Sequence, residues 1–114
     1  MFGIQYSRRA EADLVAIGAY TLQQWGVEQT IRYLDQLETC CERLAENPLL
    51  GRPCDEIRPG LRRMEQGRHV IFYRQQKKGI VVSRILHQRM LPERHDLGDK
   101  RYSALDLSSE RMSL

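Results

Sequence analysis

The segment of residues 67–90, GRHVIFYRQQKKGIVVSRILHQRM, constrains the fold of this chain more than any other part of its sequence. Two runs in it, 69–74 and 80–87, are rich in β-branched and aromatic residues, and the five residues between them are polar apart from a glycine. This pattern predicts a β-hairpin. Apolar side chains occur at odd and at even positions of both runs, and strands of that kind are normally covered on both faces. The rest of the chain, or a partner, must therefore supply two covering layers.

Regular alternation assigns the side chains of the hairpin to its two faces. The second run is expected to place Ile80, Val82 and Leu86 on one face, and Val81 and Ile85 on the other. Two further strands are expected beside the hairpin. Residues 61–66 have the pattern of the first strand of a three-strand meander, and residues 2–6 that of a short edge strand.

Two helical patterns lie between the edge strand and the meander. Ser7 is expected to cap the first helix, in which apolar residues recur at steps of three and four from Ala10 onward, and Gly26 to close it in a left-handed conformation. The second helix carries the strongest periodic signal, with apolar residues at positions 27, 31, 34, 37, 41 and 44. The short link predicts an antiparallel αα-hairpin. The expected fold class is α+β: an N-terminal edge strand and this αα-hairpin packed on a small, mainly antiparallel β-sheet.

The remaining segments carry no clear helix or strand pattern. Residues 47–60, NPLLGRPCDEIRPG, contain three of the four prolines and two glycines, which predicts a loop. We expect one domain over residues 1–95, followed by a polar tail at 96–114 that is disordered or becomes ordered on binding. With 47–60 assigned to a loop, no segment up to residue 90 remains to cover the second face of the sheet. A partner is expected to cover it, or in part the tail through Tyr102, Leu105 and Leu107.

Charge is distributed unevenly along the 114 residues. Residues 51–89 hold ten basic and three acidic side chains, a net charge of +7, whereas residues 1–50 carry −3 and residues 90–114 carry −1. Arginine accounts for 15 of the 18 basic residues, and its planar guanidinium group suits paired contacts with carboxylates or phosphates. The strand region is thus expected to attract an acidic protein or a polyanion, or else to balance the acidic helices as a solvated face.

Several classes of protein are excluded by what the sequence lacks. No apolar run approaches the length of a membrane span and no signal segment opens the chain, which predicts a cytoplasmic protein without membrane contact. Cys40, Cys41 and Cys54 suggest neither a disulfide framework nor a metal site, so buried reduced thiols are expected. No phosphate-binding glycine loop or nucleophile motif occurs. We therefore expect no cofactor and no metal.

Four segments, in this order along the chain, resemble the small toxins of the RelE/ParE superfamily. They are RRAEADLVAIGAYTLQQWG, YLDQLETCCERLAENPLLGRP, RPGLRRMEQGRHVIFYR and VSRILHQRM, and together they reach from residue 8 to residue 90. The amino-acid sequences of these segments are closer to the ParE branch of this superfamily. The resemblance implies the toxin of a bacterial type II toxin–antitoxin module, neutralised by a small antitoxin encoded beside it.

The resemblance to the ParE branch also implies a target and partners. ParE-like toxins poison DNA gyrase, and their antitoxins, of the ParD type, resemble ribbon-helix-helix DNA binders with a flexible C-terminal segment that wraps the toxin. The toxin would reach operator DNA only through the antitoxin, within a hetero-oligomer. An acidic, amphipathic antitoxin segment laid across a basic sheet would supply the missing cover.

The RelE branch cleaves mRNA on the ribosome, and this chemistry requires a base, an acid and positive charge on the phosphate. The candidates for such a site are His87, Arg62, Arg84 and Glu65. In relatives resembling YoeB an aromatic residue follows the histidine at the strand end, but here Gln88-Arg89-Met90 follows, and the lysine-rich cluster of RelE is missing. A toxin that acts by binding is therefore favoured. A ribosome-dependent endoribonuclease and an inactive antitoxin-binding relative remain as alternatives.

Two sets of contact residues follow from this interpretation. Antitoxin contacts are expected at Arg68, Tyr73, Arg84 and Arg89, because these residues are assigned to the uncovered or basic part of the sheet. Target contacts are expected at Arg62, Arg63, His87 and Met90. The structural alternative for His87 is a strand-end histidine that is hydrogen-bonded to the following loop, and His69 is expected to be a packing or surface residue.

Overall fold

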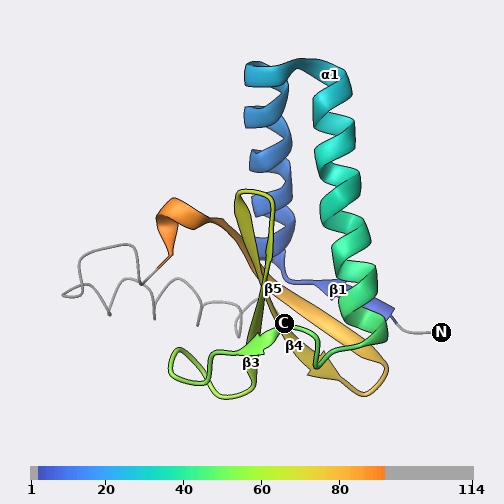
Figure 1. Cartoon of the computed structure of the whole chain (residues 1–114), viewed down its shortest axis with the longest axis vertical. Helices are drawn as coiled ribbons and strands as arrows, with labels where there is room; N and C mark the ends of the chain where they lie inside the picture. The colour runs from blue at the N-terminus through green and yellow to red at the C-terminus, as the bar shows by residue number, and fades with distance from the viewer. Residues whose placement is uncertain (1–2, 92–114) are drawn as a thin grey trace.

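A computed structural model describes residues 3–91, which form a five-stranded sheet with a helical hairpin packed on one face (Figure 1). The elements are β1 Gly3–Tyr6, α1 Arg8–Glu46, β2 Arg52–Pro53, β3 Leu61–Gln66, β4 His69–Gln76, β5 Gly79–His87 and the 3₁₀-helix η1 Gln88–Met90. The strand order is β1-β5-β4-β3-β2, and every pairing is antiparallel except that of β1 with β5. The predicted α+β fold is confirmed. The tail at 96–114, with Tyr102, Leu105 and Leu107, lies outside the described residues.

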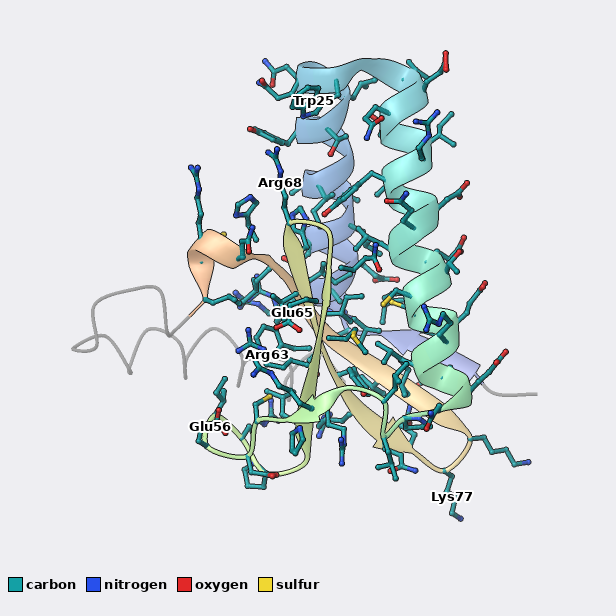
Figure 2. All side chains as sticks on the ribbon, viewed as in Figure 1. Trp25, Glu56, Arg63, Glu65, Arg68 and Lys77 are labelled. Atoms are coloured by element: carbon teal, nitrogen blue, oxygen red, sulfur yellow. The ribbon has the colours of Figure 1, made fainter. Side chains whose placement is uncertain are left out.

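The helix α1 reverses its direction at Gly26, so that it forms a hairpin with a first arm, residues 8–25, and a second arm, residues 27–46 (Figure 1). Gly26 has φ 87° and ψ 178°, a conformation that is open to glycine because it lacks a Cβ atom. Ser7 caps the first arm by accepting a hydrogen bond from the Ala10 backbone N–H at 3.0 Å. Trp25 lies at the tip of the hairpin (Figure 2). Both the predicted cap and the predicted glycine turn are confirmed.

The first face of the sheet packs against the base of the helical hairpin. Tyr73, Ile80 and Leu37, all fully buried, belong to one apolar core. The other members of this core are Ala10, Ile17, Cys40, Cys41, Leu44, Ala45, Ile71, Val82 and Ile85. No α1 residue between Thr21 and Leu37 is fully buried, although Tyr33 and Leu34 of this stretch pack against the core.

The second face of the sheet is covered by part of residues 47–60, the segment predicted to be a loop. Cys54, at 1% exposure, packs with Leu61, Val70, Phe72, Leu86 and Leu91 in a second apolar core, and Ile57 borders it. Hydrogen bonds from the Cys54 N–H to the Leu61 carbonyl oxygen (2.9 Å) and from the Ile57 N–H to the Cys54 carbonyl oxygen (3.0 Å) fold the segment back onto the sheet. The expectation that no residue up to 90 covers this face is wrong.

A β-bulge changes the face assignment at the end of β5. Phe72 pairs with Arg84 but Tyr73 pairs with Val82, so Ser83 is an extra residue in β5. The extra residue reverses the alternation, which brings Ile85 to the helix-covered face and Leu86 to the second core. The expectation that Leu86 shares a face with Ile80 is therefore wrong, because regular alternation does not continue through a bulge.

The turn between β4 and β5 is shorter than the five residues predicted from composition. Pairing continues to Gln76 and Gly79, so only Lys77 and Lys78 form the turn. Gly79 has φ +134°, and a Cβ atom there would collide with the backbone of Gly3 in β1. The turn therefore needs glycine both for its backbone angle and for the close approach of β1.

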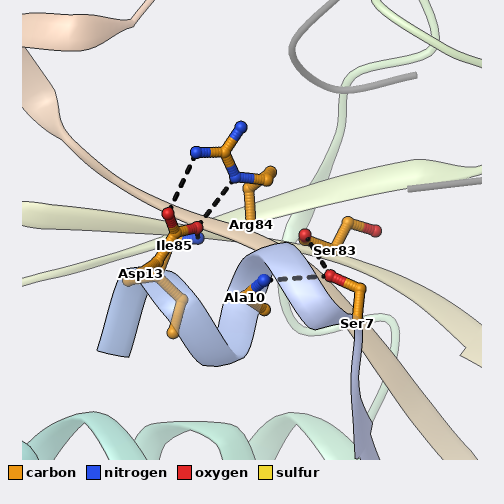
Figure 3. Close-up of polar contacts among 6 residues, drawn as sticks. All are labelled: Ser7, Ala10, Asp13, Ser83, Arg84 and Ile85. Carbon is orange, nitrogen blue, oxygen red and sulfur yellow. Dashed lines mark hydrogen bonds and ion pairs between the residues drawn. The ribbon is translucent and has the colours of Figure 1, made fainter. Parts of the chain in front are cut away.

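The base of α1 is anchored to β5 at the bulge (Figure 3). The Asp13 carboxylate accepts hydrogen bonds from Nε and Nη2 of Arg84 at 2.8 and 2.9 Å, and one from the Ile85 backbone N–H at 2.9 Å. At the N-cap of α1, the Ser7 hydroxyl donates to the Ser83 carbonyl oxygen at 2.7 Å, and the Ser7 N–H donates to the Val82 carbonyl oxygen at 3.0 Å. β1 pairs with β5 only up to Val82, and these contacts occupy the β5 edge beyond that point.

We expect Asp13→Ala to lower the free energy of unfolding by about 3 kcal/mol, because it leaves a buried arginine and a strand N–H without this partner. The Arg84 and Asp13 side chains are only 8% and 14% exposed. Urea denaturation followed by circular dichroism measures the change. The matched control is Arg52→Ala, which removes an ion pair to Glu65 with side chains 65% and 55% exposed and should change stability by less than about 1 kcal/mol. Equal costs for the two variants would show that the anchor does not stabilise the fold.

Candidate functional site

The sheet-end surface, formed by Arg68, His69, His87, Arg89 and Met90, lies where the β3–β4 turn meets the end of β5. The Tyr33 hydroxyl of α1 lies 2.5 Å from His69 Nδ1, and it accepts a hydrogen bond from the Arg68 backbone N–H at 3.1 Å. The rings of His69 and His87 pack edge to face with centroids 5.2 Å apart. Arg68 and Arg89 are exposed, and Met90 is 42% exposed. The second arm of α1 thus fixes the turn and both histidines, while two arginines and a methionine remain accessible.

Both histidines favour their neutral form. Burial lowers the pKa of His69 to about 4, and the nearby His87 adds to this effect. Burial lowers the pKa of His87 too, together with the positive charges of Arg89 and Arg68. His87 Nδ1 accepts a hydrogen bond from the Arg89 N–H at 3.1 Å and so caps η1. The hydrogen bond expected between a strand-end histidine and the loop that follows is thus present at His87.

The four candidate nuclease residues do not come together. Glu65 lies opposite Val70 and Leu86 of the second core, whereas His87 contacts His69 on the helix-covered face. The Glu65 carboxylate pairs with Arg63 at 3.2 Å and with Arg52 at 3.4 Å. Figure 2 shows Glu65 and Arg63 side by side on the sheet, apart from Arg68 at the β3–β4 turn. A general acid and a general base are therefore not placed around one common position.

The two remaining members of that set are engaged elsewhere. Arg84 is held by Asp13, as described above. The Arg62 guanidinium donates hydrogen bonds to the carbonyl oxygens of Gly51 and Leu49 in the loop before β2. Both arginines thus contact protein groups rather than an open phosphate site.

Three of the predicted contact residues are buried. Tyr73 is 0% exposed and lies on the helix-covered face, where its hydroxyl donates to the Pro48 carbonyl oxygen at 2.7 Å and accepts from the Gly51 N–H at 2.8 Å. Arg84 and Arg63 are each 7% exposed, and Arg63 stacks over the Phe72 ring at 5.6 Å. The expectation that Tyr73 and Arg84 lie on an uncovered part of the sheet is therefore wrong.

The interarm groove, a hollow of about 610 Å³ between the two arms of α1, has no counterpart in the sequence-based predictions. It is lined by Tyr6, Leu14, Val15, Gly18, Ala19, Leu22, Thr30, Leu34, Asp35, Leu37, Glu38, Cys41 and Ile85. Val15 and Leu22 on its first-arm wall are 73% and 49% exposed. On the second arm, Val27 and Ile31 are 62% and 57% exposed although they belong to the predicted apolar face. The periodicity predicted this apolar face correctly, but beyond Leu34, which packs against the core, its residues Val27 and Ile31 are largely exposed.

Within residues 3–91 no group of three or more His, Cys, Asp or Glu side chains is arranged to hold a metal ion. Cys40, Cys41 and Cys54 are free and buried, and burial raises the pKa of the Cys41 and Cys54 thiols to about 11. These thiols are thus protonated and poor nucleophiles. No helix in the same part of the chain has the length and apolar character of a membrane span.

Stability should fall as the pH decreases from about 6.5 to about 4, because the unfolded chain takes up a proton on His69 in this range and the folded chain does not. His69→Gln, which keeps a hydrogen-bonding side chain, should show a smaller difference between its urea midpoints at pH 7.5 and pH 4.5 than the original chain. Carboxyl groups titrate equally in both proteins and cancel in this comparison. An unchanged difference would contradict the burial of a neutral imidazole at position 69.

Comparison with known proteins agrees with the resemblance found in the sequence. Residues 4–92 match the family model described as ParE toxin of type II toxin–antitoxin system, parDE. Toxin ParE1 of Mycobacterium tuberculosis is 46% identical over 90 residues, which cover 78% of this chain and 92% of that protein. Toxin ParE1 of Caulobacter vibrioides is 44% identical over 89 residues, with the same two coverages. A solved structure titled Chromosomal ParDE TA system from P. aeruginosa has a TM-score of 0.64 and 26% identity, covering 76% of this chain and 96% of that one.

Proposed function

Since the chain belongs to the ParE toxin family of type II toxin–antitoxin systems, we propose that it inhibits DNA gyrase by binding and is neutralised by a ParD-like antitoxin. The observation that carries a binding mechanism is the separation of Glu65 from His87 on opposite faces of the sheet. What remains accessible at the sheet end is arginine and methionine, which are enriched in protein interfaces. Inhibition by contact requires such a surface and no reacting group.

Two surfaces support an antitoxin partner. The interarm groove exposes apolar side chains to solvent, and its volume is in the range of ligand pockets. The sheet-end surface adds the exposed Arg68 and Arg89, whose guanidinium groups suit acidic side chains. We propose that one flexible antitoxin segment, from a ribbon-helix-helix protein, contacts both surfaces in a cytoplasmic hetero-oligomer. The toxin then reaches operator DNA only through that antitoxin.

The expected contact residues divide by accessibility. Arg68 and Arg89 are proposed as direct antitoxin contacts, whereas the buried Tyr73 and Arg84 act through the loop at Pro48 and through the anchor at Asp13. For the target, His87, Met90 and the half-buried Arg62 are proposed as contacts. Arg63, which is buried and stacks over Phe72, is proposed to hold β3 in place beside Arg62 rather than to contact the target.

A supercoiling and DNA-cleavage gel with purified gyrase tests the function. Titrated toxin should abolish supercoiling and trap cleaved DNA, and purified antitoxin added afterwards should reverse both effects. Intact supercoiling from a folded toxin that binds antitoxin would overturn the proposal. Cleavage of mRNA within minutes of induction would then favour the ribosome-dependent endoribonuclease, and the absence of either effect an inactive antitoxin-binding relative.

A charge-reversal pair tests the antitoxin contacts at the sheet end. Arg68→Glu with Arg89→Glu should weaken antitoxin binding by about tenfold or more, as measured by calorimetry, because two exposed cations that face an acidic segment become anions. The matched control is Lys77→Glu with Lys78→Glu. It changes the net charge equally at the β4–β5 turn, where Lys77 lies at the other end of the sheet from Arg68 (Figure 2). Equal affinity losses in both pairs would mean that only net charge matters.

A further inference from the structure

The interarm groove has a charge opposite to that of the chain as a whole. Among the residues that line it, the only charged side chains are Asp35 and Glu38, both exposed on the second arm. One turn beyond Glu38 the same arm carries the exposed Glu42. Burial raises the pKa of Tyr6 on the groove floor, and the nearby Glu38 and Glu42 add to this effect. The chain carries a net charge of +3. The groove therefore has one acidic rim on a basic protein.

The opposite wall of the groove is uncharged. The first arm contributes Leu14, Val15, Gly18, Ala19 and Leu22, and none of these side chains can form an ion pair. An occupant would thus meet apolar side chains on one side and carboxylates on the other. The two flanks of a segment bound in the groove would therefore lie in different environments.

The apolar surface is long enough for a helix. Leu34 and Glu38 line the groove, and Val27 and Ile31 precede them at helical spacing, so that the four side chains form one row along the second arm. From Val27 to Glu38 the arm rises by about 16 Å, at about 1.5 Å per residue. This distance matches three turns of a second helix, whereas a small molecule would leave much of the row exposed.

We propose that the interarm groove binds an amphipathic helix whose apolar stripe lies between the arms and whose flank along the second arm carries lysine or arginine. The inference rests on the proposed function, in which this helix belongs to the antitoxin. The antitoxin segment then changes sign along its length, basic beside Asp35 and Glu38 and acidic beside Arg68 and Arg89. Such a pattern permits only one direction of the segment and rejects an antitoxin with an acidic flank at the groove.

Two synthetic peptides test the preference directly on the full chain. Both are helical 18-residue peptides with leucine at i, i+3, i+4 and i+7 positions, and they differ only in carrying lysine or glutamate along one flank. Fluorescence anisotropy should give roughly tenfold tighter binding of the lysine peptide at low salt, with the difference decreasing in high salt. Amide chemical shifts should change at Val15, Leu22 and Leu34. The net charge of the chain alone predicts the opposite preference.

Exposed substitutions on the second arm provide the control. Asp35→Lys with Glu38→Lys should reverse the preference, whereas Glu28→Lys with Glu46→Lys, which alters net charge equally outside the groove lining, should preserve it. All four positions are exposed, and unchanged urea midpoints confirm that the variants fold. Equal binding of the two peptides, preference for glutamate, or shift changes away from the groove would each overturn the inference.

The outcome is independent of the gyrase measurement. If gyrase inhibition and its reversal by antitoxin persist while the peptides show no preference for lysine, the proposed function stands and the inference fails. If gyrase is unaffected while the lysine peptide binds in the groove, the target is wrong and the inference about the groove stands.

Discussion

The paired hydrogen bonds from Arg84 to the Asp13 carboxylate join the two layers of this fold at the point where the sheet changes its regularity. The same carboxylate accepts from the Ile85 N–H, so it satisfies both a buried cation and a strand edge. An ion pair inside a protein loses much of its Coulombic gain to desolvation, and extra hydrogen bonds offset part of that loss. Here they also set the register of α1 against β5, because Ser7 contacts Ser83 while Asp13 contacts Arg84 and Ile85.

The other end of the helical hairpin, around Gly26, carries large apolar side chains that are mostly exposed. The buried side chains of α1 lie near its two ends, and the stretch around Gly26 carries Trp25, Val27 and Ile31 on its surface. A protein with so small a core would gain stability by burying them. Their exposure fits a surface that is completed by a partner, and the hollow between the arms gives that partner a defined position.

Sequence patterns predicted the elements well where the signal is local. Ser7 and Gly26 mark the ends of the first arm because capping and a positive φ depend on single residues. The second cover was missed because Cys54 and Ile57 are apolar residues in a segment rich in proline and glycine, where periodicity carries no information. The buried state of Tyr73 and Arg84 was missed because it depends on contacts with Pro48 and Asp13 far away in the chain. The interarm groove depends on where the sheet ends beneath the arms, which no pattern within either helix reveals.

The extra residue at Ser83 decides which groups face one another at the end of the sheet. With regular alternation from Ile80, the side chain at position 87 would leave His69 and point to the face that holds Glu65. A carboxylate and an imidazole would then share one side of the sheet, as an acid–base pair requires. The bulge at Ser83 thus keeps the Glu65 carboxylate and the His87 imidazole on opposite sides of the sheet, where a regular strand of the same sequence would bring them to one side.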